Sequence, residues 1–352
     1  MRQFDYTKLA NRTWDNDTVN LLTQIHEAKG RLEAQLAHNP NEQVKAVEIV
    51  KLKSAEASNE IEGIEVSSAR LKQLISGRSD PRTRSEQEIA GYRDALSEVL
   101  ETPECIPVTT DGILRLHDIL FSHRDDASRG RLKNTQNYIS SRDEQGKVFT
   151  LFTPLAPYEA GPALERICAE YNRVIEAGRV DPLIVIPVFI HDFLCIHPFD
   201  EGNGRMSRLL TTLLLYRSGY SIVKFISPEA KIAEDKDGYY HALATSQYAW
   251  HEGEDDPRPF IKYLLGTIAS AYRDFEEPAA AMSEDAAPID MVRRAAAAED
   301  DRFTKADIMR KTPSLSVATV ERAIKKLCDD GELEKRGQGR STYYLKRDAK
   351  TQ

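Results

Sequence analysis

Apolar residues recur at helical spacing through most of the first hundred positions. The clearest stripe is made of Leu21, Leu22, Ile25, Ala28 and Leu32. Similar stripes follow in residues 44–52 and 89–99. Apolar residues three and four positions apart lie on the same face of a helix, so this part of the chain is predicted to form amphipathic helices.

The pattern changes between Tyr138 and Phe152. Two β-favouring runs, 138–139 and 148–152, flank a polar turn at 143–146, which predicts a short hairpin. Helical spacing resumes near Ala163. The most apolar run, 183–196, is interrupted by Asp192 and is too short to cross a bilayer, so it is predicted to be a buried helix.

A small separate domain is predicted at the carboxyl end. Residues 276–288 lack bulky apolar side chains and contain two prolines, which favours a linker. The elements expected after it are helices over 289–298, over 305–311 and from a cap at Ser316 to Gly331, then strands 333–335 and 342–345 joined by a turn at 337–339. Three helices followed by a hairpin are typical of a winged helix, a variant of helix-turn-helix.

The chain is therefore predicted to be mainly α, with a helical bundle, a short β-hairpin and a small winged-helix domain. Its 352 residues are 41% hydrophobic and 30% charged, as in ordinary soluble globular proteins. The expected regions are a helical region over 1–100, a central domain over 101–275, a linker over 276–288 and the winged helix over 289–352.

Charge and cysteine content narrow the class of protein. The net charge of −8 argues against a nucleic-acid coat over the whole chain, but residues 289–352 carry 15 Lys and Arg against 11 Asp and Glu, a net +4. The four cysteines form no metal or disulfide motif, and the first residues hold no apolar signal core. We expect a cytoplasmic protein without a membrane segment.

One short segment, residues 197–208, combines several groups that phosphate chemistry uses. Gly202, Asn203 and Gly204 bend the chain into a helix, whose first backbone N–H groups favour an anion. Arg205 and Arg208 follow, and arginine binds phosphate oxygens in a bidentate manner. The segment therefore predicts a site for a phosphate chain.

Two further side chains supply what a transfer reaction needs. Glu201 offers an oxygen to Mg²⁺, which proteins usually hold with one or two carboxylates plus substrate phosphates. His197 can accept a proton from an incoming hydroxyl. Each feature alone has a plain structural explanation, but their combination within twelve residues favours a catalytic site.

The same segment resembles the signature HxFx(D/E)GNGRxxR of the Fic (filamentation induced by cAMP) family at every defined position. The resemblance implies transfer of AMP from ATP to a protein hydroxyl, with release of pyrophosphate. By matching position, His197 would be the general base, Phe199 the buried anchor and Glu201 the Mg²⁺ ligand. The implied phosphate-binding residues are Gly202, Asn203, Gly204, Arg205 and Arg208.

The resemblance extends more loosely to either side. The hairpin near 138–152 looks like the family's flap, which pairs with the target segment as an added strand. Residues 239–261 look like the stretch that closes the adenine pocket, and Tyr240 and Gln247 are the candidates there.

A second family pattern, (S/T)xxxE(G/N), matches residues 58–63, which we call the inhibitory segment. Ser58 and Glu62 are four apart and share one helix face, and Gly63 can end that helix. The resemblance implies an inhibitory helix near 50–63, with Glu62 pairing with Arg208 in the place of the γ-phosphate. A plain helix end with surface glutamates is the alternative.

Several functions stay open at this stage. The chain can be an autoinhibited adenylyltransferase, an enzyme that uses another nucleotide donor or removes AMP, or a regulator that binds DNA through its winged helix. The small domain can equally dock a protein or support a homodimer. The target hydroxyl (Tyr, Thr or Ser, on another protein or on the chain itself) is not fixed by the sequence.

Overall fold

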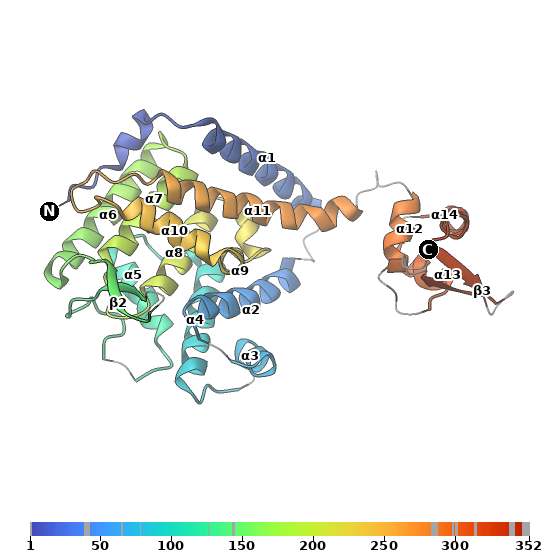
Figure 1. The fold of residues 1–352 in the computed structure, drawn as a ribbon, viewed down its shortest axis with the longest axis horizontal. Helices are drawn as coiled ribbons and strands as arrows, with labels where there is room; N and C mark the ends of the chain where they lie inside the picture. The colour runs from blue at the N-terminus through green and yellow to red at the C-terminus, as the bar shows by residue number, and fades with distance from the viewer. Residues whose placement is uncertain are drawn as a thin grey trace. The chain divides into compact units, whose positions relative to one another are not determined.

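Helices make up most of the protein, as the hydrophobic pattern predicts (Figure 1). The computed structural model describes residues 2–38, 43–64, 66–77, 79–125, 127–142, 145–282, 288–297, 299, 302–312, 315–337 and 342–346. The chain divides into two compact units, Met1–Arg273 and Asp274–Gln352.

The first unit joins the two regions that the sequence analysis separated at residue 100. That boundary falls inside a helix, α4, which packs against helices from both sides. The helices that begin in this unit are α1 (Asn16–His38), α2 (Gln43–Ile61), α3 (Ser68–Ile75), α4 (Arg84–Glu101), α5 (Thr110–Leu120), α6 (Pro157–Ala177), α7 (Pro182–Ile196), α8 (Asn203–Arg217), α9 (Pro228–Glu234), α10 (Lys236–Gln247) and α11 (Arg258–Met282). Short 3₁₀ turns are η1 (Tyr6–Asn11), η3 (Pro103–Cys105) and η4 (Ser221–Lys224).

Helix α7 lies in the core, as its apolar sequence predicts. Every residue from Leu183 to Ile196 is buried, and the helix packs against α6 and α8. A helix that is apolar all round finds its place inside a bundle. Its one carboxylate, Asp192, accepts hydrogen bonds from the Tyr6 hydroxyl at 2.8 Å and the Trp250 indole at 2.7 Å. Within the described residues, no helix is long and apolar enough to cross a membrane.

Helix α2 is fixed against α4 and α9 by a buried carboxylate. Glu229, 1% exposed, accepts hydrogen bonds from Ser54 on α2 and Tyr92 on α4, each at 2.8 Å. Buried carboxylates are stable where such donors surround them. The network therefore holds the end of α2, which carries the inhibitory segment, beside α8.

The predicted hairpin is present as two antiparallel strands, β1 (Ile139–Arg142) and β2 (Val148–Phe152). The first strand begins one residue later than expected and is longer. Part of the expected turn, residues 143–144, lies outside the described residues. Val148, Phe149 and Leu151 are about half exposed, so the hairpin presents apolar side chains to the surface.

The second unit has the order of elements that the sequence predicts. Its elements are α12 (Pro288–Ala297), α13 (Lys305–Lys311), α14 (Val317–Asp329), β3 (Leu333–Arg336) and β4 (Tyr343–Lys346). An additional bridge joins Phe303 to Tyr344, and Ser316 caps α14 by accepting from the Thr319 N–H. Residues 338–341, which include most of the expected turn, lie outside the described residues.

The predicted linker is partly wrong. Helix α11 continues to Met282, so residues 276–282 are helical; residues 283–287 lie outside the described residues. The stretch is rich in alanine, which has little bulk but the highest helix propensity of any residue. Low apolar content therefore did not mean an irregular chain, and Pro278 did not end the helix.

Candidate active site

The site is built around the turn from α7 into α8. His197 follows the last residue of α7 and adopts a left-handed backbone with φ of +52°. A left-handed conformation costs a non-glycine residue about 1–2 kcal/mol, so the surrounding bonds must hold it. The His197 N–H bonds to the Phe193 carbonyl at 2.9 Å, and the Lys133 N–H bonds to the Pro198 carbonyl at 2.8 Å.

Asn203 and Phe199 lock the rest of the loop. The Asn203 side chain accepts from the Phe199 N–H at 3.0 Å and donates to the Phe199 carbonyl at 2.7 Å. The Phe199 ring is fully buried and stacks on His117, with ring centroids 3.8 Å apart. Asn203 was expected among the phosphate-binding residues, and that role stays a prediction; its side chain holds the loop through both of these bonds.

Removing the buried ring should unfold the site. We expect Phe199→Ala to lower the free energy of unfolding by about 3–5 kcal/mol, the usual cost of deleting a buried phenylalanine. Chemical denaturation of the full chain measures it. Phe149→Ala, which truncates a ring that is 45% exposed on the hairpin, is the matched control and should cost less than about 1 kcal/mol. Equal losses in both variants would contradict the anchoring role of Phe199.

The tautomer of His197 follows from the hydrogen bond that its ring makes with Leu194. Its Nδ1 lies 3.1 Å from the Leu194 carbonyl oxygen, which can only accept, so Nδ1 carries the proton. Nε2 is then left with a free lone pair. Burial lowers the pKa of His197 to about 4, despite the opposing effect of the Leu194 bond. The ring is therefore a neutral proton acceptor at ordinary pH.

This pKa predicts an unusual pH profile. The base form is active, so kcat/KM should rise with pH through about 4 and change less than about twofold between pH 5.5 and 8. A histidine with the ordinary pKa of 6.5 would lose about tenfold at pH 5.5. Initial rates at saturating Mg²⁺, with the protein's stability checked at each pH, decide between the two.

A buried lysine supports the same turn. Lys133 is 3% exposed. Its ammonium group donates hydrogen bonds to the Ile196 carbonyl at 3.2 Å and to the Asn137 side-chain oxygen at 2.9 Å. Burial lowers the pKa of Lys133 to about 8. Nothing in the local sequence marked this residue, because it lies 64 positions before His197.

The first turn of α8 contributes backbone N–H groups and a buried arginine to the site. Gly202 precedes the helix with φ of +84°, and the first N–H groups of any helix lack partners within it. The Arg205 guanidinium is buried against the Phe121 ring, 5.1 Å from its centroid. Its Nε and Nη1 have no hydrogen-bond partner among the described residues. A buried guanidinium that has N–H groups without hydrogen-bond partners, at a helix amino terminus, is suited to bind a phosphate.

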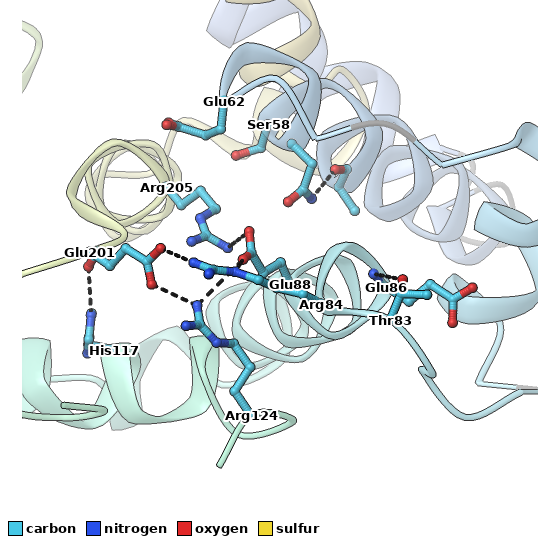
Figure 2. A network of polar contacts seen from close by, with 12 residues as sticks. Ser58, Glu62, Thr83, Arg84, Glu86, Glu88, His117, Arg124, Glu201 and Arg205 are labelled. Carbon is cyan, nitrogen blue, oxygen red and sulfur yellow. Dashed lines mark hydrogen bonds and ion pairs between the residues drawn. The ribbon is translucent and has the colours of Figure 1, made fainter. Parts of the chain in front are cut away.

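Carboxylates and arginines form a network beside Arg205 (Figure 2). Glu88 on α4 lies 3.3 Å from Arg205 Nη1 and 2.9 Å from Arg84 Nε. Arg84 in turn contacts one carboxylate oxygen of Glu201, and Arg124 Nη1 donates to the other oxygen, Oε2, at 2.8 Å. Glu88, Arg84 and Arg124 were missed at the sequence level because they come from outside the signature.

Glu201 fits the expected role of a metal ligand in its chemistry. Its carboxylate is 42% exposed at the cavity, and a hard cation prefers such an oxygen. Its backbone carbonyl accepts from His117 Nε2 at 3.1 Å, which fixes the position of the residue. The guanidiniums of Arg84 and Arg124 each contact one of the carboxylate oxygens, so a Mg²⁺ ion bound there would share the carboxylate with two cations.

The inhibitory segment reaches Arg208, as the sequence pattern predicts. Arg208 is 2% exposed; its Nε donates to the Ser58 hydroxyl at 2.9 Å, and its Nη2 donates to the Ser58 carbonyl at 3.0 Å and to Glu62 Oε1 at 2.7 Å. Burial raises the pKa of Glu62, but Arg208 outweighs it and the pKa is lowered, so Glu62 is charged. Helix α2 ends at Ile61, and Gly63 continues with φ of +75°.

Glu62 lies close to the amino end of α8 as well. A Cβ built on Gly204 would overlap with Glu62 Oε1 and lie 3.3 Å from Arg208 Nη1. Only a glycine leaves room for this approach. The Glu62 carboxylate therefore contacts Arg208 and lies against the amino end of α8 at Gly204.

One cavity of about 1010 Å³ joins these parts. Its wall includes His197, Arg205, Arg208 and Glu62, together with the start of the first strand and the end of the second strand of the hairpin. Tyr240 and Gln247, the candidates for the adenine pocket, line the same cavity. Such a volume accommodates a nucleotide-sized ligand.

The central part of the chain is similar to a known protein family and to several characterised proteins. Residues 107–215 match the model of the Fic/DOC family. The chain carries a Fic domain. The protein adenylyltransferase fic-1 of Caenorhabditis elegans is 29% identical over 194 residues, which cover 54% of this chain and 33% of that protein. The protein adenylyltransferase Fic of Nematostella vectensis is 26% identical over 219 residues, 59% of this chain and 44% of that protein.

Solved structures support the helical fold around the Fic domain. A Fic family protein from Desulfovibrio desulfuricans G20 has a TM-score of 0.61 at 23% identity, covering 97% of this chain and 98% of that one. A fragment of Fic-1 from Caenorhabditis elegans has a TM-score of 0.56 at 22% identity, covering 76% and 74%. The chain thus spans between a third and a half of the length of the curated relatives named above, and its match to these structures establishes the fold.

Proposed function

We propose that this protein transfers AMP from ATP to a hydroxyl group of a protein, releasing pyrophosphate. One observation carries the proposal: His197, a neutral base with its Nε2 free, shares a cavity with the amino end of α8 and two buried arginines. The names of the curated relatives, protein adenylyltransferases, support it.

In the proposed reaction, His197 Nε2 takes the proton of the incoming hydroxyl. The hydroxyl oxygen forms a bond to the α-phosphorus, and the bond from that phosphorus to the bridging oxygen breaks, so that pyrophosphate leaves. The backbone N–H groups of Asn203 and Gly204 and the Arg205 guanidinium hold the phosphate oxygens as charge shifts toward the leaving group. Arg208 is assigned to the γ-phosphate.

Glu201 is the residue we assign to Mg²⁺, which when bound would neutralise negative charge on the triphosphate. Tyr240 and Gln247 are assigned to the base of the nucleotide, because they line the part of the cavity formed by α10. The exposed apolar strand β2 is the proposed contact for the target segment.

Glu62 is proposed to restrain this activity. Its carboxylate occupies two of the contacts that a γ-phosphate would make, one with Arg208 and one near Gly204. ATP that binds beside it would have its phosphates displaced from the line of attack. Misplacement of reacting atoms by about 1 Å can cost about a hundredfold in rate.

Labelled ATP tests the function directly. The full chain with Glu62→Gly is incubated with Mg²⁺ and ATP labelled on either the α- or the γ-phosphate, alone and with a cell extract. We expect protein-bound label from the α-phosphate and none from the γ-phosphate. Label from the γ-phosphate would indicate a kinase, and no label in the chain or the extract would refute AMP transfer.

A further inference from the structure

Helix α14 in the second unit presents a cationic face to the surface. Its opposite face is buried against the core of this unit through Val320, Ala323, Ile324 and Leu327. Arg322, Lys325 and Lys326 are exposed on the outer side. Residues three and four apart are neighbours on a helix, so these cations form one cluster, which we call the α14 cluster.

Several cations elsewhere in this unit are paired with carboxylates. The ion pairs are Arg293–Glu332 at 2.7 Å, Lys305–Glu321 at 2.6 Å, Lys311–Glu299 at 3.0 Å and Arg336–Glu334 at 2.6 Å. The α14 cluster has no ion pair among the residues that the structure describes, and neither has Lys335 on β3. Among the described residues of this unit, the cations without an ion pair are therefore those on α14, Lys335 and Lys346 on the hairpin, and Arg302, while Asp329 and Asp330 make the end of α14 acidic.

The first turn of α14 has a different character. Val317 is 47% exposed and Ala318 is also exposed, directly after the cap at Ser316. Short apolar side chains at the start of a recognition helix can contact thymine methyl groups, while cations further along reach the phosphates. Exposed apolar and cationic residues are thus arranged in the order that a groove-binding helix requires.

We propose that the second unit binds double-stranded DNA, with α14 in the major groove and the α14 cluster and Lys335 on the phosphate backbone. Three helices followed by an antiparallel hairpin, with a bridge from Phe303 to Tyr344, is the arrangement that docks a helix in this way. The rest of the chain is acidic overall, so the contact is confined to this unit. The proposal is independent of AMP transfer.

The test measures binding of the full chain to a fluorescent duplex of mixed sequence over a range of KCl concentrations. Each lost phosphate contact lowers the slope of log Kd against log salt by about 0.9. The triple variant Arg322→Ala, Lys325→Ala, Lys326→Ala should therefore lower the slope by about 2–3 and weaken binding more than tenfold at low salt. The matched control, Lys305→Ala with Arg310→Ala, removes two cations that are paired with carboxylates and should bind like the wild type.

Two results would overturn the proposal. One is the absence of binding at low salt, or equal salt slopes for the triple variant and its control. The other is equally tight binding of polyglutamate at the same salt concentration, which would assign the α14 cluster to an acidic protein. AMP transfer, measured in the same samples, should be unchanged in both variants, so this test does not depend on the outcome for the Fic domain.

Discussion

Glu62→Gly should raise the rate of AMP transfer by about ten- to a hundredfold. The substitution removes a charge-assisted hydrogen bond of 2.7 Å to Arg208, and such bonds contribute about 1.5–3 kcal/mol. Each 1.4 kcal/mol corresponds to a factor of ten, so this contact alone accounts for the expected range. Initial rates of α-label incorporation measure the change.

Two matched variants separate the effect of losing the Glu62 charge from the effect of loosening the end of helix α2. Glu60→Gly removes an exposed glutamate two residues earlier, in the last turn of α2, and introduces a glycine beside the same helix end, so it should leave the rate within about twofold. Glu62→Gln keeps the shape and removes the charge, so its rate should lie between wild type and Glu62→Gly. A gain in Glu60→Gly as large as in Glu62→Gly would point to the helix end instead of the carboxylate.

His197→Ala should reduce AMP transfer by at least about a hundred- to ten-thousandfold, the usual contribution of a positioned base. The loss should fall on kcat, because the contacts proposed between α8 and the phosphates do not involve the imidazole. It is best measured in the Glu62→Gly background, where the starting rate is high. A fluorescent ATP analogue reports whether the nucleotide still binds.

The control for this variant is His241→Ala, which removes an exposed histidine on α10. It should keep full activity. If His197→Ala retained more than about a tenth of the rate while binding nucleotide normally, another group would have to accept the proton.

The sequence predicted those features that are local. His197 to Arg208 form a continuous turn and helix start, so the type and spacing of residues indicated the geometry. The buried helix before them was also predictable, because its apolar run has no polar face. The contact of Glu62 with Arg208 joins residues 146 positions apart; spacing alone could not show it, and the family pattern did.

The supporting residues were not predictable in the same way. Lys133, His117 and Glu88 each contact the site from a distant part of the chain, and an isolated polar residue in the sequence resembles a solvated one until the fold buries it. The first part of the predicted linker, residues 276–282, is helical for the opposite reason, because an alanine-rich sequence fits the composition of both a spacer and a helix.

Arg208 needs an anion in every state of the protein. Its guanidinium is 2% exposed, and an unpaired buried charge costs several kcal/mol, so Glu62 cannot leave an empty cavity without a penalty. If Glu62 restrains the enzyme as proposed, the carboxylate and the last phosphate of ATP are exchangeable counterions for one cation. On that proposal the nucleotide concentration sets how often Glu62 releases Arg208, and a protein without the Glu62 carboxylate should unfold at a lower temperature when ATP is withheld.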